Sequence, residues 1–584
     1  AQPVRIRQAH GGARLVPRRA ATSAGSSSSC KTPGTALLFP LGLQSWKHSV
    51  AQRPSLPTST RALASARKGH LEVRACGIIG IFKWDGPVNA ELYEGLMMLQ
   101  HRGQDSAGMV TADDDGRGRW SFKDLRANGL VRDVFNASTM KNLTGSVGIG
   151  HVRYPTAGGL NAAEAQPFFV NSPFGIMLIH NGNITNTSEL RELVQLQDDI
   201  SYRRHLRTDS DSEILLNVFA DEIHRAHKMR PTDTDNDLVF QAVCEVMNRV
   251  SGAFSVITLI DGVGLLAFRD PNGIRPLVLG KRPSMHGDEW AVASEGCAFG
   301  PLGFEFVRDI APGEAVLINQ KGQCISRQCA EPNLTPCIFE YIYLARPDSV
   351  INGISVYNMQ LSLGKRLAKK ITERGWDIDI CVPVPDGSRP AAIEISHELR
   401  IPYREGLVKN RYVGRTFLMP DQRIRELSVR RKLNAMESVL KGQKILLIDD
   451  SIVRGTTMRQ IVDMCRRAGA AKVYLASAAP PVRYPNVYGV DLPSRKEMVA
   501  YDCTEDEVRN LLGADGLIYQ TVEDLEAAGL ELNPEIQRFD MSVFDGIYVT
   551  KDIDEMYLDD LQMGRGKGRD QTGRLPPKVA AGNF

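Results

Sequence analysis

The 584-residue sequence lacks several features that mark membrane, disulfide-stabilised or zinc-binding proteins. No run approaches the ~20 consecutive apolar residues that a membrane-spanning helix needs. The ten cysteines are unevenly spaced and include no Cys-x-x-Cys pair, which argues against a disulfide framework and against a zinc ribbon. We therefore expect reduced thiols and no membrane partner.

Acidic residues are nearly missing from the first 75 positions, which hold twelve Lys or Arg, the single acid Glu72 and the serine run 26–29. This composition is typical of an organelle transit peptide, so we expect residues 1–75 to be a disordered leader directing the chain to the plastid stroma, with the mitochondrion as the alternative. A nucleic-acid-binding arm has a similar charge. The whole chain is formally +3, but the remainder has 59 basic and 67 acidic residues and a charge of −8. We therefore expect no nucleic-acid partner.

Removal of the leader would make Cys76 the first residue, in the run Ala75-Cys76-Gly77-Ile78-Ile79-Gly80. A free α-amine titrates near pH ~8, so its neutral fraction can take a proton from the adjacent thiol. The alternative is a small buried cysteine at the start of a strand. Cys76 is therefore a candidate nucleophile whose base depends on cleavage.

The remaining ~500 residues exceed a single hydrophobic core, so two domains are expected. From residue 76 to about 320, short apolar segments rich in β-branched residues predict strands, among them 148–153, 175–182 and 254–259. Amphipathic stretches at 90–100 and 212–227 predict helices between them. Sheets covered by helices, an α/β architecture in the broad sense, follow.

Polar clusters lie at the ends of these segments, at 101–108, 153–158, 180–184 and 208–213. Each alone is typical of a turn or a helix cap. As one ordered set with the Cys76 run, they resemble the N-terminal-nucleophile glutamine amidotransferases over residues 76–320. The resemblance implies an αββα sandwich.

The same resemblance implies roles for six residues. Cys76 would attack the side-chain amide of glutamine, form a glutamyl thioester and release ammonia. Asn181 and the N–H of Gly182 would form the oxyanion hole. Arg153 would bind the α-carboxylate of glutamine and Asp211 its α-ammonium group, while Arg102 would line the same pocket.

The segment 444–457 predicts a second site. Four apolar residues bounded by charge predict a buried parallel strand, and Asp449 and Asp450 then stand at its carboxyl end, where open α/β sheets bind ligands. Gly455 allows the backbone to approach a phosphate closely, and the start of the expected helix 458–468 favours an anion. An ordinary strand–turn–helix is the alternative.

This segment resembles the type I phosphoribosyltransferase signature for 5-phosphoribosyl-1-pyrophosphate (PRPP), which implies a doubly wound parallel-sheet domain over 335–515. Asp449 and Asp450 would hold the ribose hydroxyls directly or through Mg²⁺, and residues 453–457 would cradle the 5-phosphate. The implied PRPP-binding residues are Asp386, Ser388, Arg389, Lys409, Arg411, Arg415, Asp449, Asp450, Ser451, Arg454, Gly455, Thr456 and Thr457.

Two loops complete that implied site. Residues 384–389 match the pyrophosphate loop, but many relatives have Ser or Thr where Gly387 stands, so a hydroxyl that contacts Mg²⁺ is missing here. Pyrophosphate binding should then rest on backbone N–H groups, Ser388 and Arg389. Residues 409–417 match the flexible loop that closes over PRPP and excludes water.

A glutaminase followed by a phosphoribosyltransferase resembles the family of glutamine PRPP amidotransferases, from residue 76 to about 560. The implied reaction converts PRPP, glutamine and water to 5-phosphoribosylamine, glutamate and pyrophosphate, the committed step of purine synthesis, with ammonia channelled between the sites. The resemblance also implies inhibition by purine nucleotides and a homo-oligomer, a tetramer or dimer. Residues 516–562 are expected to be a helical segment and 563–584 a disordered tail.

Two alternatives remain. A hexosamine-forming or asparagine-forming glutamine-dependent enzyme would share the Cys76 half but would not carry residues 449–457. A PRPP-binding regulatory protein with an inactive glutaminase would not need Cys76, Arg153, Asn181 and Asp211 intact.

One branch of the family holds a [4Fe-4S] cluster on four cysteines. Only Cys337 fills such a position here, because Asn486 occupies the second and residues 538–543 contain no cysteine. Cluster ligation needs thiolates at all corners. We therefore predict no iron–sulfur cluster.

Overall fold

The structure is a computed structural model that describes residues 75–154 except 115 and 117, 162–196, 204–229, 235–410, and 432–566 except 493. All of them belong to one compact unit, Arg61–Phe584. Most of the predicted leader and tail, and the loop residues Arg411 and Arg415, lie outside the described residues. Within the described part of the chain, no helix is both long and apolar enough to cross a membrane.

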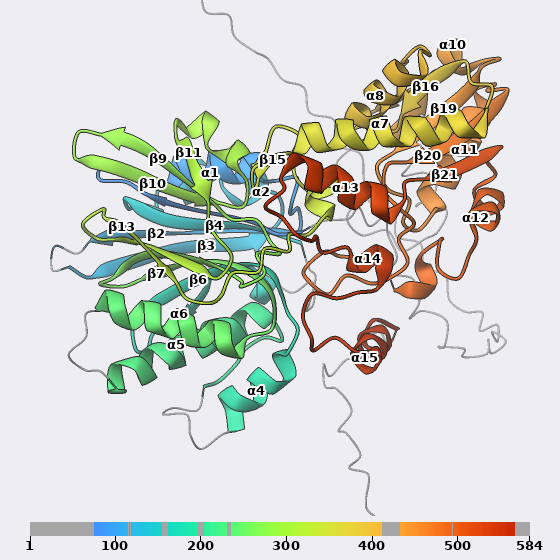
Figure 1. The fold of residues 1–584 in the computed structure, drawn as a ribbon. Helices are drawn as coiled ribbons and strands as arrows, with labels where there is room; N and C mark the ends of the chain where they lie inside the picture. Colours follow the sequence, from blue (N-terminus) through green and yellow to red (C-terminus); the bar gives the residue numbers. More distant parts are fainter. Residues whose placement is uncertain are drawn as a thin grey trace, which may run out of the picture. The chain divides into compact units, whose positions relative to one another are not determined.

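Two stacked antiparallel sheets form the first half (Figure 1). One has seven strands in the order β11-β9-β10-β1-β4-β2-β3, and the other has six in the order β13-β12-β8-β7-β6-β5. The strands are β1 Gly77–Phe82, β2 Ser106–Asp114, β3 Trp120–Asn128, β4 Val147–Arg153, β5 Phe168–Val170, β6 Ile176–Ile184, β7 Gly252–Ile260, β8 Gly264–Arg269, β9 Val278–Ser284, β10 Gly287–Ala293, β11 Glu305–Asp309, β12 Glu314–Asn319 and β13 Cys324–Gln328.

Strand β7 shows why these sheets are stacked and covered. Its nine residues are all buried. Ile257 and Leu259 enter the core between the two sheets, while Phe254 and Val256 enter the core beneath α5 and α6. Successive side chains point to opposite faces of a strand, so an unbroken apolar run requires cover on both sides.

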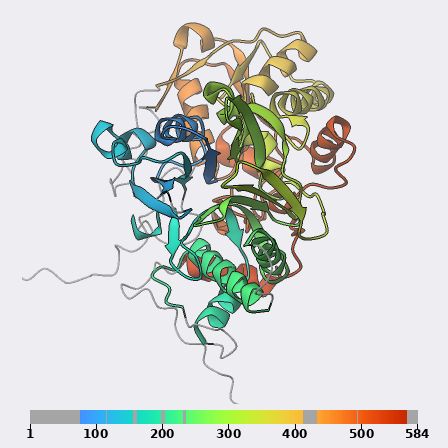
Figure 2. The same cartoon turned by 90° about the vertical axis from the view of Figure 1, so that its left-hand side faces the viewer.

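Helices supply that cover on the outer faces, as Figures 1 and 2 show for the pair α5 and α6. The outer face of the seven-stranded sheet packs on α1. The αββα sandwich expected from the sequence is therefore confirmed. The helices are α1 Asn89–Met98, α2 Val131–Val134, α3 Ala137–Met140, α4 Thr187–Leu196, α5 Asp211–Met229 and α6 Asp235–Arg249.

A parallel sheet of order β16-β19-β20-β21 forms the centre of the second half. Alternate residues of β19 enter opposite cores: Ile445 and Leu447 face α11 and α12, whereas Leu446 and Ile448 face α7 and α8. Helices on both faces give the predicted doubly wound arrangement. The elements are β14 Val350–Ile351, β15 Ile354–Ser355, α7 Val356–Arg374, β16 Ile380–Pro383, α8 Arg389–Leu399, β17 Leu407–Lys409, β18 Leu433–Ala435, α10 Glu437–Leu440, β19 Lys444–Asp449, α11 Thr456–Arg467, β20 Lys472–Ser477, α12 Glu505–Leu512 and β21 Gly516–Tyr519.

The C-terminal segment differs in one respect from the expectation. Strand β21 lies beyond residue 515, and it pairs in parallel with β20, so the sheet extends into the segment expected to be helical. The helices that follow are α13 Val522–Leu532, α14 Ser542–Asp545 and α15 Glu555–Gly566. A core cluster joins this segment to the π-helical turn η4, Glu340–Leu344.

Candidate active sites

Cys76 lies directly before β1, in the middle of the seven-stranded sheet. Its side chain is 6% exposed, and its Sγ donates to the carbonyl oxygen of Tyr154 at 3.5 Å. Burial raises the pKa of the thiol, while the charge of Arg153 lowers it and that of Asp211 raises it. Arg153 and Asp211 are thus close enough to act on the predicted nucleophile.

The predicted oxyanion residues lie together on β6. Asn181 is fully buried, and its Nδ2 donates to Oγ of Ser294 at 3.5 Å. That Oγ also accepts from the N–H of Ile78 at 3.1 Å, which ties the amide of Asn181 to the strand after Cys76. Gly182 has φ +152°, and a Cβ there would lie 1.9 Å from the carbonyl oxygen of Ala253, so no side chain fits.

The two residues expected to bind glutamine's charged groups are both held by neighbours. Arg153 Nη2 lies 2.6 Å from Oε2 of Glu164, and both side chains are nearly buried. Asp211 begins α5, and its Oδ2 accepts from the N–H of Ile184 at 3.2 Å. A substrate carboxylate would therefore have to share Arg153 with Glu164, a residue that no sequence pattern singled out.

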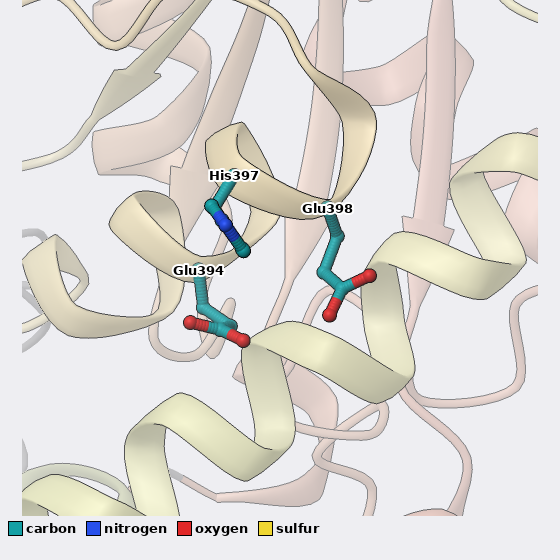
Figure 3. A group of neighbouring side chains, drawn as sticks. All are labelled: Glu394, His397 and Glu398. Atoms are coloured by element: carbon teal, nitrogen blue, oxygen red, sulfur yellow. The ribbon is translucent and has the colours of Figure 1, made fainter.

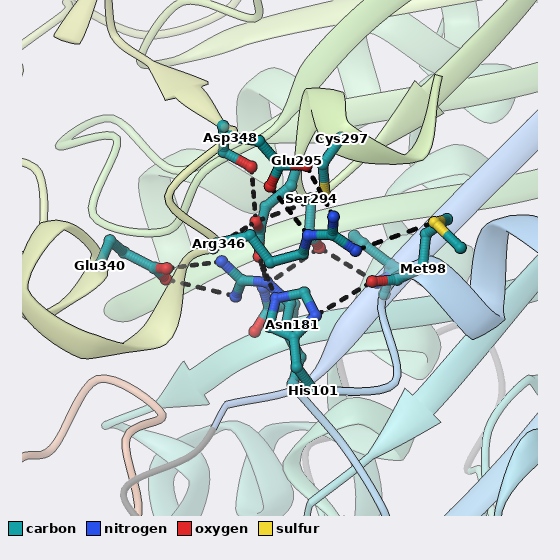
Figure 4. A network of polar contacts seen from close by, with 12 residues as sticks. Met98, His101, Asn181, Ser294, Glu295, Cys297, Glu340, Arg346 and Asp348 are labelled. Carbon is teal, nitrogen blue, oxygen red and sulfur yellow. Dashed lines mark hydrogen bonds and ion pairs between the residues drawn. The ribbon is translucent and has the colours of Figure 1, made fainter. Parts of the chain in front are cut away.

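Arg102 is buried in a charge network, of which Figure 4 labels His101, Glu295 and Glu340. Its Nε donates to Glu295 and its Nη2 to Oε2 of Glu340 at 2.5 Å. Arg275 Nη2 lies 2.7 Å from the other oxygen of Glu340. Arg102 therefore links the first half to η4, and its donors face two carboxylates.

Glu295 is the centre of this network and is fully buried. It accepts from His101 Nε2 at 2.8 Å, from the N–H of Arg346 at 3.0 Å and from Ser349 Oγ at 2.7 Å. Burial alone would raise the pKa of this carboxyl, but Arg102 and His101 outweigh it and hold the pKa well below its usual value. Polar residues directly after a strand were the signal that predicted the other site residues. Ser294 and Glu295 follow β10 in the same way, so this signal could have found them.

Asp449 and Asp450 stand at the carboxyl end of β19, as predicted. Burial raises the pKa of Asp450 to about 7. Burial and the neighbouring charge of Asp450 raise the pKa of Asp449 well above its usual value. Gly455 precedes α11 with φ +72°, and a Cβ there would meet Val499 at 2.8 Å. Gly455, Thr456 and Thr457 line the cavity described below, and the start of a helix favours an anion.

The structure explains why position 387 is a glycine, which the sequence did not reveal. A Cβ built at this position would lie 2.3 Å from Oδ2 of Asp450. The space that a serine or threonine side chain would need is therefore filled by the carboxylate itself. Asp450 stays in place partly through Ser451, whose Oγ donates to its Oδ1 at 3.1 Å.

The pyrophosphate-loop residues form a small ionic group. Asp386 accepts from Arg389 Nη1 at 2.6 Å and lies 3.3 Å from Lys409 Nζ. Ser388 is nearly fully buried, and its hydroxyl donates to the carbonyl oxygen of Val384 at 2.6 Å. The hydroxyl of Ser388 is thus committed to its own loop, while Arg389 and Lys409 face a carboxylate that a pyrophosphate could replace.

One cavity of about 1820 Å³ joins these groups. It reaches from the second site to Arg102 of the first half. The predicted PRPP residues that line it are Asp386, Arg389, Lys409, Asp449, Asp450, Ser451, Arg454, Gly455, Thr456 and Thr457.

The two halves also touch at the oxyanion strand. Asn183 Nδ2 donates to the carbonyl oxygen of Val487 at 2.9 Å. Gly489 has φ +95°, and a Cβ there would lie 2.6 Å from the carbonyl carbon of Gly182. Two glycines therefore meet where the second half contacts the predicted oxyanion hole.

The positions that the family resemblance matched with iron–sulfur ligands have other structural roles in this chain. Cys337 is buried, and its backbone forms a bridge with Asp540. Asn486 Oδ1 accepts from the N–H groups of Tyr488 and Val490. The residues present do not fit a four-thiolate cluster, and its absence stays a prediction.

Glu394, His397 and Glu398 form a separate group on α8 (Figure 3). Their possible ligand atoms lie within 4.8 Å of one another. The group is half-buried to exposed, and convergence on one helix face alone does not indicate an ion. We therefore assign no metal to it.

Comparison with family models finds a glutamine amidotransferase domain at residues 156–300 and a phosphoribosyl transferase domain at 357–510. The chain is 53% identical over 489 residues to an amidophosphoribosyltransferase of Escherichia coli (strain K12), covering 83% of this chain and 94% of that protein. It is 46% identical over 518 residues to the amidophosphoribosyltransferase of Saccharomyces cerevisiae (strain ATCC 204508 / S288c), covering 87% and 99%.

Two solved structures are similar over most of their length. The glutamine PRPP amidotransferase from B. subtilis, complexed with ADP and GMP, has a TM-score of 0.70 at 35% identity, covering 82% of this chain and 98% of that one. A structure described as the allosteric regulatory enzyme of purine biosynthesis has a TM-score of 0.72 at 35% identity, covering 83% and 99%.

Proposed function

Because the chain belongs to the amidophosphoribosyltransferase family, we propose how its own residues divide that reaction between two sites. The enzyme is a glutamine-dependent phosphoribosyltransferase of purine biosynthesis. It converts PRPP, glutamine and water to 5-phosphoribosylamine, glutamate and pyrophosphate. The observation that carries the division is the cavity that runs from Asp449 and Asp450 to Arg102.

At the first site, Cys76 is the nucleophile. Its thiolate attacks the side-chain carbonyl carbon of glutamine, ammonia leaves, and water later releases glutamate from the thioester. The N–H of Gly182 and the Asn181 amide donate to the developing oxyanion, and the hydrogen bond of Asn181 to Ser294 holds that amide in position. Arg153 binds the α-carboxylate and Asp211 the α-ammonium group of glutamine.

The base for Cys76 is the α-amine that cleavage after Ala75 would create. Burial raises the pKa of the thiol, so a base next to it is needed at neutral pH. Residues 1–75 are a transit peptide in this proposal, directing the enzyme to the plastid, with the mitochondrion as the alternative. The support is compositional: twelve basic residues and one acid.

At the second site, PRPP lies across the carboxyl end of β19. Asp449 and Asp450 bind the ribose hydroxyls, and the N–H groups at the start of α11 with Thr456 and Thr457 bind the 5-phosphate. Two adjacent carboxylates, a half-buried Asp449 and a buried Asp450, whose pKa values are both raised, fit a hard cation with oxygen ligands. Mg²⁺ held there would neutralise negative charge on the substrate.

Arg389 and Lys409 bind the pyrophosphate, which leaves when ammonia attacks C1 of the ribose. Both cations now pair with Asp386, so binding exchanges one anion for another. Arg411 and Arg415, in a loop outside the described residues, are proposed to close the site. Ammonia released at Cys76 would enter the cavity near Arg102, and enclosure there would keep it from protonation by bulk water.

Purine nucleotides are proposed as feedback inhibitors, because the B. subtilis relative is complexed with ADP and GMP. A homo-oligomer, a tetramer or a dimer, is proposed with them. Sedimentation of the purified enzyme tests the oligomeric state, and PRPP turnover measured with and without ADP and GMP tests the inhibition.

The decisive experiment replaces Cys76 with Ala in the chain that begins at residue 76 and supplies either glutamine or ammonia. We expect glutamine-dependent phosphoribosylamine synthesis to be abolished and PRPP-dependent use of ammonia to persist. A matched control, Cys324→Ser, should keep both activities. Loss of both activities in a folded Cys76→Ala enzyme would contradict the division, and absence of PRPP turnover in the unmodified enzyme would favour a regulatory protein.

A further inference from the structure

Two cysteines outside both sites come together where α6 meets the end of β13. Cys244 lies in α6, and Cys329 directly follows β13. Each thiol is the largest single influence on the pKa of the other, as neighbours would be, and both are free and half-buried. Neither residue takes part in the chemistry described above.

Backbone geometry places the two sulfurs together. Helical side chains tilt towards the N-terminus and lie over the preceding turn, so the Cys244 side chain lies over the turn that contains Phe240. The Sγ of Cys329 is 3.7 Å from the carbonyl oxygen of Phe240. The end of β13 and this turn of α6 thus bring both thiols to one place.

Contacts that do not involve the thiols hold this arrangement. The guanidinium of Arg327 lies 4.6 Å from the ring centroid of Phe240, and its Nη2 lies 2.6 Å from Oδ1 of Asp237. Phe240 and Asp237 both belong to α6. The two cysteines are therefore kept adjacent whether or not a bond joins them.

We propose that Cys244 and Cys329 are a reversible thiol modification site, which forms a disulfide when a small-molecule disulfide such as oxidised glutathione is present. The Cys244 thiolate attacks one sulfur of glutathione disulfide, forms a mixed disulfide and releases one glutathione thiolate. Cys329 then gives up its proton, attacks the Cys244 sulfur and releases the second thiolate. Two protein thiols lose two electrons and two protons, and one glutathione disulfide becomes two thiols.

The local charges assign the order of these steps. The neighbouring Cys329 thiol and the charge of Arg327 lower the pKa of Cys244 to about 7, although burial acts in the opposite direction. The partnership with Cys244 and burial raise the pKa of Cys329. A thiol whose pKa is near the ambient pH is the most effective attacker, so Cys244 attacks first and Cys329 resolves.

Other half-buried thiols provide the contrast. Burial raises the pKa of Cys297 to about 12 and that of Cys324 to about 11. Both should stay protonated and unreactive at neutral pH. Selectivity for the Cys244–Cys329 pair thus follows from its surroundings and not from exposure alone.

The bond would join α6 to the beginning of the connection between the two halves. Cys329 is the first residue after β13, and its N–H donates to the carbonyl oxygen of Gly313. The connection continues to Cys337, whose N–H donates to Ile274. Oxidation therefore adds a covalent attachment at one end of this connection without using a residue of either active site.

The experiment equilibrates the enzyme that begins at residue 76 with graded mixtures of oxidised and reduced glutathione at pH 7.5. Acid quenching, maleimide labelling of free thiols and peptide mass spectrometry then follow. We expect the loss of two hydrogens and a peptide pair that joins 244 to 329, both reversed by excess reduced glutathione. The wild-type result does not depend on any variant folding.

Three variants separate the steps. Cys329→Ser should leave a lasting glutathione adduct on Cys244, and Cys244→Ser should modify Cys329 at least tenfold more slowly than Cys244 is modified in the first variant. Cys324→Ser is the matched control and should form the cross-link like the unmodified enzyme. Absence of the 244–329 peptide pair in fully oxidised buffer would overturn the proposal, as would equal modification rates for the two thiols.

Discussion

Gly387 gives the sharpest test of the second site, because the phosphoribosyltransferase resemblance and the structure assign it opposite requirements. The resemblance implies Ser or Thr at this position, so replacing Gly387 with Ser would supply the implied hydroxyl contact to Mg²⁺. The structure instead shows that a Cβ here would lie 2.3 Å from Oδ2 of Asp450. Ordinary van der Waals contact begins at 3.4 Å, so the carboxylate or the loop must shift by about 1 Å.

The size of the effect follows from what Asp450 is proposed to hold. A displacement of this kind breaks a hydrogen bond between the carboxylate and a ribose hydroxyl, and hydrogen bonds to charged groups contribute about 1.5–3 kcal/mol. We therefore expect Gly387→Ala and Gly387→Ser to lower kcat/KM for PRPP by about 10- to 150-fold. Both variants should lose similar activity, because the Cβ and not the hydroxyl causes the clash.

The assay measures pyrophosphate release with ammonia as the nitrogen source and PRPP varied, so Cys76 takes no part. Gly300→Ala is the control, because a Cβ at Gly300 meets nothing within 4 Å. Melting temperatures show whether each variant is folded. A Gly387→Ser enzyme with wild-type or higher kcat/KM for PRPP would refute the reasoning.

Three further predictions concern other parts of the molecule. Burial raises the pKa of Asp450 from 3.8 to about 7, so the folded metal-free protein loses stability as pH rises between these values. Asp450→Asn should stabilise the protein by up to about 4 kcal/mol at pH 8 and should lose this advantage near pH 4, as melting scans in chelator would show. The same variant should abolish PRPP turnover in rate assays. Glu295→Gln should lower the free energy of unfolding by about 3–5 kcal/mol, since it leaves Arg102 short of a buried partner; urea titration measures this, and a change below 1 kcal/mol would contradict the network. Gly489→Ala should lower glutamine-dependent activity at least tenfold, or about 1.4 kcal/mol, and spare the use of ammonia, because the new Cβ presses on Gly182; equal loss with both nitrogen sources would mean general misfolding.

Much of the fold follows from local patterns. Unbroken apolar runs such as 445–448 predicted buried strands, and the structure confirms them because both faces of each sheet are covered by other elements. Helix periodicity likewise placed α1 and α5 within two residues of their ends. The residue before a helix and the polar residue after a strand lie within a few positions of the element that they bound. The ends of an element can therefore be predicted from local sequence.

The partners of the site residues could not be predicted in the same way. Glu164 meets Arg153, and Glu340 meets Arg102 across 238 positions of sequence. Such pairs depend on how strands and loops are brought together in three dimensions, and no spacing in the sequence encodes them. Gly387 shows the same limit, since the absence of a side chain was visible but the carboxylate that fills the space was not.

The contact between Gly182 and Gly489 has a consequence for how such enzymes can diversify. Each half could in principle be exchanged for that of a relative, since each has its own cores. At this point, however, a Cβ at Gly489 of the second half would enter the backbone of Gly182 in the first half. A chimera assembled from two relatives would need a glycine at position 489 or fail at this junction, so the phosphoribosyltransferase is constrained to evolve with the glutaminase it contacts.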